Sequence, residues 1–464
     1  MDTRNLGFVI AAVKGELLAG SPTLPLSRVS TDSRDLREGD LFFAIQGERF
    51  DGHEFIAEAA AKGATAVIVH RLPVGGLPPG IAVIKVANTR QALAHLAARY
   101  RLDFEFPVVC VAGSNGKTTT KEMTASLLSS SWPVAKSEAS HNNDIGVPTT
   151  ILHWQARHRA AVVEAGTNHP GELRPLLDII RPTIGVIPSI GREHLEHFGD
   201  IEGVLQEESQ LPEVLGKEGL LILNGDMPYA DGVAAKSAAR VIRVGFGEDN
   251  HWRIRVEAAL WERTAFHIDS PQSEWNGTWL LGMPGRHMVH NAALGVAVAA
   301  SLGIDPVRAR EALARFTGAK QRLQLSRPGG LWLLDDTYNA NADSVLAALQ
   351  TLCDLPCAGR RVAVLGDMAE LGPHAETAHE EVGKFAAKLG LDALFAIGRY
   401  SLITAAAAAG RVAVGAFPDV DSAVPAVRAY LKPGDAVLAK ASRSSRLERV
   451  VEALRQEFNT VGAE

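Results

Sequence analysis

The fold of this chain is decided by the stretch PVVCVAGSNGKTTTKE, at residues 107–122. It opens on a short apolar run, as in a buried strand, and leads into a Gly-Lys-Thr bracketed by glycines and then into a helical sequence. Backbone N–H groups in a glycine-rich turn, together with a helix N-terminus, attract phosphate oxygens. The standard pattern has a glycine where this chain has Val111, so the match is to a shortened form, G-x-x-G-K-T-T. The stretch therefore predicts a phosphate loop between a strand and a helix.

The residue types of this loop suit the phosphates of a nucleotide. Lys117 is expected to reach the terminal phosphates, and the Thr118 hydroxyl is expected to bind Mg²⁺. An ordinary strand-to-helix turn is the alternative interpretation. The residues predicted to line the nucleotide here are Gly113, Ser114, Asn115, Gly116, Lys117, Thr118 and Thr119.

Length, charge and cysteine usage narrow the class of protein. The chain has 464 residues, which suits two or three domains. Its net charge of −6 argues against nucleic acid as the main partner, because nucleic acid binding needs a basic face. No apolar run reaches the length that spans a bilayer, and the three cysteines give no disulfide framework. We expect a cytoplasmic, monomeric enzyme that acts on small molecules.

Three blocks follow one another along the chain. Residues 1–83 alternate short strands and helices and end near a Pro- and Gly-rich loop at 72–80. Residues 84–316 hold the phosphate loop among apolar runs and helical patterns, and residues 317–464 show the same alternation. This alternation predicts an α/β fold with largely parallel sheets and helices on both faces. Ligands of such sheets collect at the carboxyl ends of the strands, where we expect the site.

A metal ion at the transferred phosphate needs carboxylate ligands. Glu164 follows the apolar run AAVV, so it is expected at the carboxyl end of a strand in the same block as the phosphate loop. A solvated glutamate at the end of a strand is the alternative interpretation.

A second carboxylate, Glu208, falls on the apolar stripe of a predicted helix. Asp200 suits an N-cap, and helical spacing over 201–211 places Glu208 on one face with apolar residues, while Glu207 is expected to face away. A lone buried carboxylate is costly unless it is paired or bound to metal. His194 is a candidate partner ligand, and a core or surface histidine is the common alternative. The pattern predicts a functional carboxylate at Glu208.

Together these stretches resemble the Mur ligase family, which builds the peptide of the bacterial cell-wall precursor. The resemblance covers nearly the whole chain. The motifs that carry it, in the family's order, are GSNGKTTTKE (113–122), HNNDIGVP (141–148), EAGTNHPGE (164–172), HLEHFGD (194–200), MPGRHMVHNAA (283–293), DDTYNANADS (335–344), LGDMAELG (365–372) and KASRSSRLE (440–448). Two of them, DDTYNANADS and LGDMAELG, look like the motifs of the family member that acts last. The Asp-Asn-Pro-Arg signature of the member that adds diaminopimelate or lysine does not occur.

The resemblance implies a three-domain plan: a small α/β domain that binds UDP, a central ATPase-like domain with the phosphate loop, and a C-terminal Rossmann-like domain. It implies ATP and Mg²⁺ as cofactors, and UDP-N-acetylmuramoyl-tripeptide and D-alanyl-D-alanine as substrates. ATP would phosphorylate the terminal carboxylate of the tripeptide, and the dipeptide amine would attack the acyl phosphate. The third residue of the tripeptide, lysine or diaminopimelate, stays open.

The resemblance also implies roles for individual residues. Thr118, Glu164, His194 and Glu208 would form the metal site, and Lys117, Glu164, His194 and Glu208 would be catalytic. Beyond the loop, the nucleotide would meet Asn291, Arg322, Asp336 and Asn339. The uridine diphosphate site would be formed by Ser30, Thr31, Ser33, Arg34, Gln46 and Gly47, and the sugar–peptide would lie near Asn142 and Asn143. For any one of these polar residues, a cap or turn is the alternative.

Three positions depart from the family pattern. Glu208 stands where the family usually has a lysine that CO₂ carbamylates. A carbamate is a carboxylate on a long stem, so we hypothesise that this chain needs no CO₂ at that position. Gln321 and Ala441 stand where glycine is usual, which puts the geometry of their loops in doubt.

Two other classes of protein could also carry such a phosphate loop. A folylpolyglutamate synthase would share the loop and the carboxylate chemistry, but it lacks a first domain such as STDSRDLREGDLFFAIQGERFDGHEF (30–55). A nucleotide-dependent binding module would explain the loop but not the carboxylate on the 201–211 stripe. Nucleotide turnover that ignores every peptide substrate would favour that module.

Overall fold

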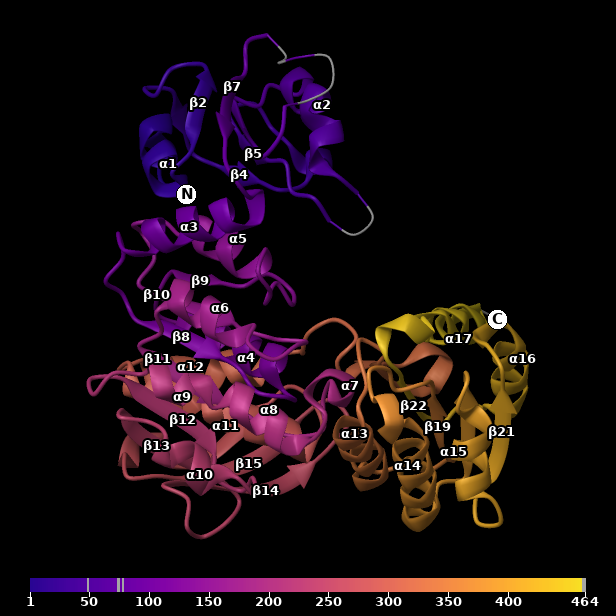
Figure 1. Cartoon of the computed structure of the whole chain (residues 1–464). Coiled ribbons are helices and arrows are strands. Elements are labelled where there is room, and N and C mark those ends of the chain that lie inside the picture. Colours follow the sequence, from indigo (N-terminus) through magenta and orange to yellow (C-terminus); the bar gives the residue numbers. More distant parts are fainter. Residues whose placement is uncertain (48–49, 73–75, 77–78, 461–464) are drawn as a thin grey trace. The chain divides into compact units, whose positions relative to one another are not determined.

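The computed structural model describes residues 1–47, 50–72, 76 and 79–460. The chain forms two compact units, and its helices and strands are drawn in Figure 1. The first comprises residues 1–110, 132–167 and 171–184, and the second comprises residues 111–131, 168–170 and 185–464. Within the described residues, no helix is both long enough and apolar enough to cross a membrane.

A five-stranded sheet forms the N-terminal part of the first unit, in the order β2-β7-β6-β5-β4. Strand β2 pairs antiparallel with β7, and the other pairs are parallel. The elements of this part are β1 (Arg4–Asn5), α1 (Leu6–Val13), β2 (Glu16–Ala19), β3 (Pro25–Leu26), β4 (Val29–Ser30), β5 (Leu41–Phe43), α2 (Ile56–Ala61), β6 (Ala66–Val69) and β7 (Ala82–Lys85). Phe42, Val67 and Val83 fill the core between the sheet and α2. Because β4 and β5 run parallel, their carboxyl ends bring the 30–34 and 46–47 segments to one edge.

A nine-stranded sheet follows, in the order β16-β15-β14-β13-β12-β11-β8-β10-β9. Its strands are β8 (Val108–Val111), β9 (Val134–Lys136), β10 (Ala160–Glu164), β11 (Ile184–Ile187), β12 (Leu220–Asn224), β13 (Arg240–Gly245), β14 (Trp252–Ala259), β15 (Thr264–Asp269) and β16 (Gly277–Leu281). Strands β12, β13 and β14 pair in parallel, as predicted, but β14, β15 and β16 form an antiparallel extension. The alternating burial of β15 reflects this arrangement, since an antiparallel strand covers the core with one face only.

Helices surround these strands, and α11 is the most completely buried of them. Its apolar sequence from Ala292 to Ala300 is buried at every position. Helix α4 packs on α11, where Gly295 allows the close approach because an added Cβ would lie 3.1 Å from Leu127. The helices are α3 (Thr89–Arg101), α4 (Lys117–Ser129), α5 (Gly146–Leu152), α6 (Leu173–Ile180), α7 (Leu195–Phe198), α8 (Ile201–Glu208), α9 (Gln210–Val214), α10 (Ala230–Ala235), α11 (Arg286–Ser301) and α12 (Pro306–Ala314).

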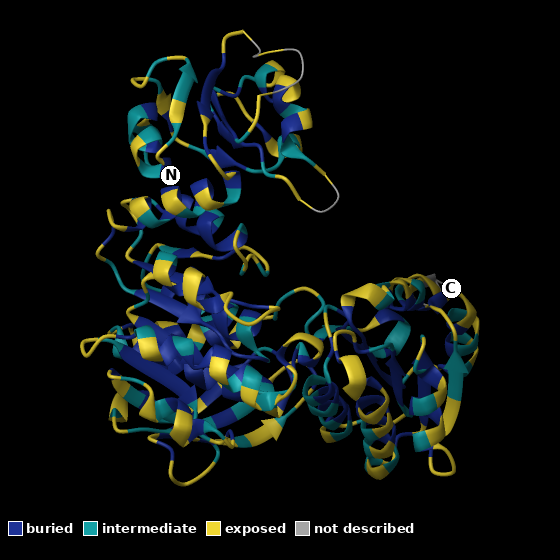
Figure 2. Ribbon diagram, viewed as in Figure 1, coloured by how far each residue is buried: buried dark blue, intermediate teal, exposed yellow. Residues whose placement is uncertain are grey.

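A six-stranded sheet forms the C-terminal part of the second unit, in the order β17-β18-β22-β19-β20-β21. Only the β17–β18 pair is antiparallel among its pairs. The elements are β17 (Gln324–Ser326), β18 (Trp332–Asp336), α13 (Ala342–Asp354), β19 (Arg361–Leu365), α14 (Ala375–Leu389), β20 (Ala393–Ile397), α15 (Ser401–Ala408), β21 (Ala413–Phe417), α16 (Val420–Tyr430), β22 (Ala436–Lys440) and α17 (Glu448–Thr460). Figure 2 shows its central strands buried, whereas its helices have one buried and one exposed side. The α/β class is thus confirmed in the five-, nine- and six-stranded sheets.

The predicted domain limits stay predictions. The limit at 83/84 falls inside β7, and the limit at 316/317 falls between α12 and β17. Of the loop predicted at 72–80, residues 73–75 and 77–78 lie outside the described residues.

Candidate functional site

The phosphate loop connects β8 to α4, which begins at Lys117. Gly113 and Gly116 have φ angles of +106° and +86°, in a region that other residues rarely adopt. Both glycines also have close neighbours. A Cβ on Gly113 would lie 2.5 Å from the Ser189 carbonyl oxygen, and one on Gly116 would lie 2.7 Å from Asn291 Oδ1. The loop therefore needs glycine at both positions, and Asn291 lies beside it.

Lys117 is held by oxygen acceptors at the base of the loop. Its Nζ donates to the carbonyl oxygens of Gly113 at 2.5 Å and Ser114 at 3.0 Å, and to Glu193 Oε2 at 3.1 Å. Glu193 is buried, so little water separates its side chain from the lysine. The sequence analysis missed Glu193. Its position directly before His194 was the available signal, but no spacing rule distinguishes it from a surface glutamate.

Glu208 contacts the same loop from α8. Its Oε2 accepts a hydrogen bond from the Gly113 N–H at 2.6 Å, and its side chain is buried. Burial raises the pKa of Glu208 to about 8, because desolvation disfavours the charged form, and this outweighs the opposing effect of Lys117; Glu193 raises it further. The predicted burial of this carboxylate is confirmed, and its contact with the phosphate loop is new.

The predicted helix over 201–211 needs two corrections. Helix α8 ends at Glu208, and α9 begins at Gln210, with Pro212 in its first turn. Glu207 does not face solvent as expected: it is buried, and its Oε2 accepts a hydrogen bond from Gln210 Nε2 at 2.7 Å. Both glutamates lie in the last turn of α8, and Gln210, at the start of α9, contacts Glu207 there.

His194 adopts a left-handed backbone conformation, with φ of +47°, at the start of α7. Its Nδ1 lies 2.5 Å from Glu370 Oε2, and its Nε2 lies 4.0 Å from Glu193 Oε2. The contact with His194 is the largest cause that lowers the pKa of Glu370. The histidine therefore lies between carboxylates from two segments that are distant in sequence.

The third predicted block contributes side chains to this site. Arg322 Nη2 donates to Thr118 Oγ1 at 3.0 Å, and its guanidinium lies over the Tyr338 ring. Asp336 accepts from Lys440 Nζ at 2.6 Å, and the same Nζ donates to the Asn339 carbonyl oxygen at 3.0 Å. Of the predicted residues, Arg322 thus reaches the loop directly, while Asp336 and Asn339 are linked through Lys440, which the sequence analysis did not single out.

The two glycine departures have different structural outcomes. Gln321 has a φ angle of +59°, so the glycine-like conformation is retained by a residue that tolerates it less well. Ala441 is fully buried, and a Cβ on the facing Gly366 would lie 2.6 Å from the Ala441 Cβ. The glycine at 366 therefore provides the space that the methyl group of Ala441 needs.

Magnesium prefers oxygen ligands. The hydroxyl of Thr118 and the carboxylate of Glu208 are of that kind, and the buried carboxylate of Glu193 is a further donor near Lys117. These donors fit the ion in kind. Within the described residues, however, no group of three or more His, Cys, Asp or Glu residues is placed to hold a metal. The full ligand set therefore stays a prediction.

Glu164 and the two asparagines belong to the first unit. Glu164 ends β10, is buried, and accepts a hydrogen bond from Asn142 Nδ2 at 2.9 Å. Asn143 Oδ1 accepts from the Gly146 N–H at 2.9 Å, at the start of α5. The structure therefore brings Glu164 and Asn142 together, and Asn143 contacts the backbone at the start of α5; the substrate roles of both asparagines stay predictions.

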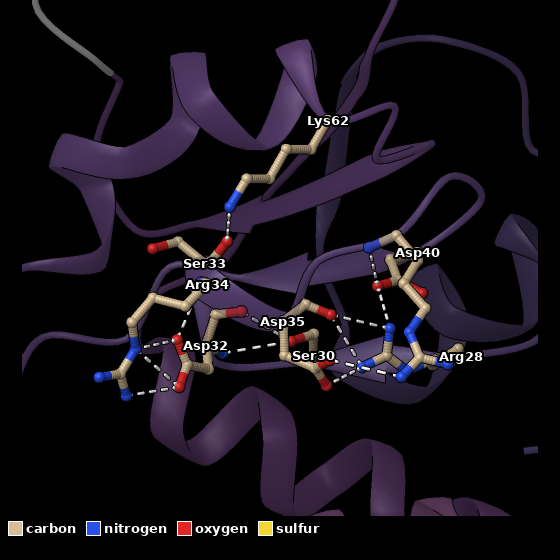
Figure 3. A network of polar contacts seen from close by, with 9 residues as sticks. Arg28, Ser30, Asp32, Ser33, Arg34, Asp35, Asp40 and Lys62 are labelled. Atoms are coloured by element: carbon tan, nitrogen blue, oxygen red, sulfur yellow. Dashed lines mark hydrogen bonds and ion pairs between the residues drawn. The ribbon is translucent and has the colours of Figure 1, made fainter.

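The predicted uridine diphosphate residues lie on two turns. In the first, Ser30 Oγ donates to the Asp32 carbonyl oxygen at 3.0 Å, and Arg34 makes a two-pronged pair with the Asp32 carboxylate (Figure 3). Lys62 Nζ donates to the Ser33 carbonyl oxygen at 2.8 Å, and Thr31 lies half-buried in the same turn.

The second turn makes backbone contacts within its own segment. Gln46 bridges to Asp51, and the Gly47 N–H donates to the Phe50 carbonyl oxygen at 2.9 Å. In the first turn, Arg34 pairs with Asp32 and its guanidinium is exposed to solvent.

A phosphate loop at the carboxyl end of β8, contacted by a buried acid pair and by an arginine from the third block, defines a nucleotide-dependent α/β enzyme. Comparison with known proteins is more specific. Residues 25–101 match the Mur ligase family catalytic domain, residues 111–299 match the Mur ligase middle domain, and residues 321–443 match the Mur ligase glutamate ligase domain. The chain belongs to the Mur ligase family.

Similar proteins cover almost the full chain. The UDP-N-acetylmuramoyl-tripeptide–D-alanyl-D-alanine ligase of Escherichia coli strain K12 is 35% identical over 457 residues, 96% of each chain. MurF from Acinetobacter baumannii has a similar structure, with a TM-score of 0.89 and 30% identity over 98% of this chain and 99% of that one. MurF ligase from Thermotoga maritima, in complex with ADP, has a TM-score of 0.80 and 28% identity over 94% of this chain and 98% of that one.

Proposed function

We propose that this chain is an ATP-dependent ligase that joins D-alanyl-D-alanine to UDP-N-acetylmuramoyl-tripeptide, in the synthesis of the peptidoglycan precursor. The observation that carries the proposal is the environment of Lys117 and Thr118, with two buried carboxylates on one side and Arg322 on the other. Full-length similarity to ligases of that name supports the choice of substrates. The ADP complex of the Thermotoga maritima relative supports ATP as the phosphoryl donor.

The chemistry follows from the need for a leaving group. A carboxylate is a poor electrophile, so the terminal carboxylate of the tripeptide takes the γ-phosphoryl group of ATP and releases ADP. The amine of D-alanyl-D-alanine attacks the acyl carbon, and the tetrahedral intermediate collapses to an amide and inorganic phosphate. Lys117 offsets negative charge as the phosphoryl group moves. Bound Mg²⁺ supplies further charge neutralisation at the phosphates.

The predicted roles of individual residues belong to the same proposal. Thr118, Glu164, His194 and Glu208 would hold Mg²⁺, and Asn291, Arg322, Asp336 and Asn339 would hold the nucleotide. The turns at 30–34 and 46–47, with Asn142 and Asn143, would bind the UDP-sugar peptide. Arg34 supports this assignment, because its exposed guanidinium suits a diphosphate. The small number of cysteines, three in 464 residues, supports action in the reducing cytoplasm, and we propose a monomer there.

Glu208 carries a further part of this proposal. Burial raises its pKa, but a bound Mg²⁺ would favour the ionised form, and the carboxylate would then supply the charge that relatives obtain from a carbamylated lysine. Its burial and its hydrogen bond to Gly113 support the assignment. We expect turnover of the wild-type protein to be unchanged when bicarbonate and CO₂ are removed. The variant Glu208→Lys is expected to gain a dependence on bicarbonate, and Glu208→Gln is the matched control without charge. A wild-type protein that slows on bicarbonate depletion would contradict the assignment.

The experiment for the reaction itself is mass spectrometry of the product. The protein is incubated with ATP, Mg²⁺, UDP-N-acetylmuramoyl-tripeptide and D-alanyl-D-alanine. The expected product is heavier than the nucleotide substrate by one dipeptide less one water. Formation of a glutamylated folate instead, from a folate and glutamate, would refute the proposal.

A further inference from the structure

A short segment after β11 binds the phosphate loop through its backbone and side chains. The Ser189 carbonyl oxygen accepts from the Ser114 N–H at 2.8 Å, and Ser189 Oγ accepts from the Asn115 N–H at 2.8 Å. The Gly191 N–H donates to Ser114 Oγ at 2.9 Å, and the same hydroxyl donates to the Gly191 carbonyl oxygen at 3.1 Å. Any displacement of residues 189–191 therefore displaces the loop.

The next residue of the segment, Arg192, binds the C-terminal part of the same unit. Its N–H donates to Asp343 Oδ2 at 2.9 Å, and its Nε and Nη2 donate to Asp343 Oδ1 at 2.9 and 2.6 Å. Its Nη1 donates to Glu381 Oε2 at 2.6 Å. Asp343 lies in the first turn of α13, and Glu381 lies on α14. One guanidinium thus joins two helices to the segment that holds the phosphate loop.

The geometry makes this contact specific for arginine. A planar guanidinium can donate to two carboxylates at once, whereas a lysine ammonium is a single point charge. The hydrogen bonds to Glu381 and Asp343 raise the pKa of Arg192. Gly191 is part of the fit, because a Cβ there would lie 2.6 Å from Asp343 Oδ2. The three charged side chains are about one-third exposed, so salt should weaken the network without abolishing it.

We propose that Arg192 is a positioning residue that couples α13 and α14 to the phosphate loop through Asp343 and Glu381. The coupling matters to the reaction because Arg322 and Asp336, from the same C-terminal part, must lie at the nucleotide; this step rests on the proposed function. Asn341, at the N-cap of α13, supports the coupling, since its Nδ2 donates to Asn115 Oδ1 at 2.9 Å. Arg192 thereby acts on the site without being at the reacting atoms.

The test uses the full chain and measures the distance between residue 217, in the block that holds the phosphate loop, and residue 432, in the C-terminal part. Spin labels are placed at Lys217→Cys and Lys432→Cys, both exposed, with Cys353 and Cys357 changed to serine. Arg192→Met is expected to shift the ratio of short to long distances about tenfold toward the long ones, because it removes two charge-assisted contacts that are only about one-third exposed. Arg192→Lys should recover part of the shift. Arg449→Met, which removes a pair with Asp421 inside the C-terminal part, should leave the distribution unchanged.

A second variant guards against a folding defect. Glu381→Gln removes one partner, and Glu380→Gln is its matched control, because Glu380 pairs with Lys384 on the same helix at 2.6 Å. We expect the distance shift and a similar fall in kcat for Glu381→Gln but not for Glu380→Gln. Unchanged distances in folded Arg192→Met and Glu381→Gln would overturn the coupling, and shifted distances with unchanged kcat would overturn the positioning role. If the wild type does not turn over these substrates, the proposed function fails, while the distances still decide the coupling.

Discussion

Replacing Gly116 with alanine tests whether the phosphate loop needs a residue without a Cβ at this position. At a φ angle of +86°, alanine costs about 1–2 kcal/mol, because Cβ crowds the following carbonyl. The new methyl group would also lie 2.7 Å from Asn291 Oδ1, so Asn291 or the loop must move. We expect the affinity for nucleotide to fall about tenfold or more. A tenfold fall corresponds to ~1.4 kcal/mol of binding free energy, which is about the net contribution of one good hydrogen bond.

Gly390 provides a matched control. It caps α14 with a φ angle of +70°, and nothing lies within 4 Å of its added Cβ. Gly390→Ala should therefore show a similar loss of unfolding free energy without a loss of nucleotide binding. The assay is isothermal titration calorimetry with ADP and Mg²⁺, paired with thermal unfolding of both variants. Wild-type affinity in Gly116→Ala, or an equal loss in Gly390→Ala, would refute this reasoning.

Other predictions concern individual groups. His290 is buried on α11, and burial lowers its pKa to about 4. Because the unfolded chain binds the proton more tightly, the free energy of unfolding falls as the pH drops below about 6.5. Between pH 7 and pH 5 this loss is about 2 kcal/mol, and urea unfolding at both pH values should show a smaller loss for His290→Gln. Asp435 is buried and accepts hydrogen bonds from the Arg360 guanidinium and from the Lys432 N–H. Asp435→Ala should therefore lower the unfolding free energy by about 3 kcal/mol. A change under about 1 kcal/mol would contradict this. Glu193→Gln should change nucleotide affinity in calorimetry, because it removes a charge 3.1 Å from Lys117, whereas the exposed Glu196→Gln should not.

The phosphate loop was predictable because its signal is local. Glycines, Lys117 and the strand–helix context lie within a few residues of one another, and the structure agrees with the expectation. The burial of Glu208 was also predictable from helical spacing. The burial of Glu207 was not, because it involves contacts such as the hydrogen bond from Gln210, which the helical spacing of α8 does not indicate.

Contacts between distant segments were the harder part. Glu193, Lys440 and Arg192 have no distinctive spacing, and their roles depend on partners such as Lys117, Asp336 and Asp343 that the fold brings near them. The antiparallel strands β15 and β16 were missed for a similar reason. Their apolar alternation reads like any half-buried strand, and pairing direction is set by neighbours rather than by the strand itself.

Phosphate release from ATP tests the central claim most directly. The protein is given ATP and Mg²⁺ with UDP-N-acetylmuramoyl-tripeptide and D-alanyl-D-alanine together, and then with each alone. The ligase account predicts sustained release only when both are present, and none from Lys117→Met under the same conditions. Release that is indifferent to both substrates would contradict it and indicate a nucleotide-dependent module without ligation.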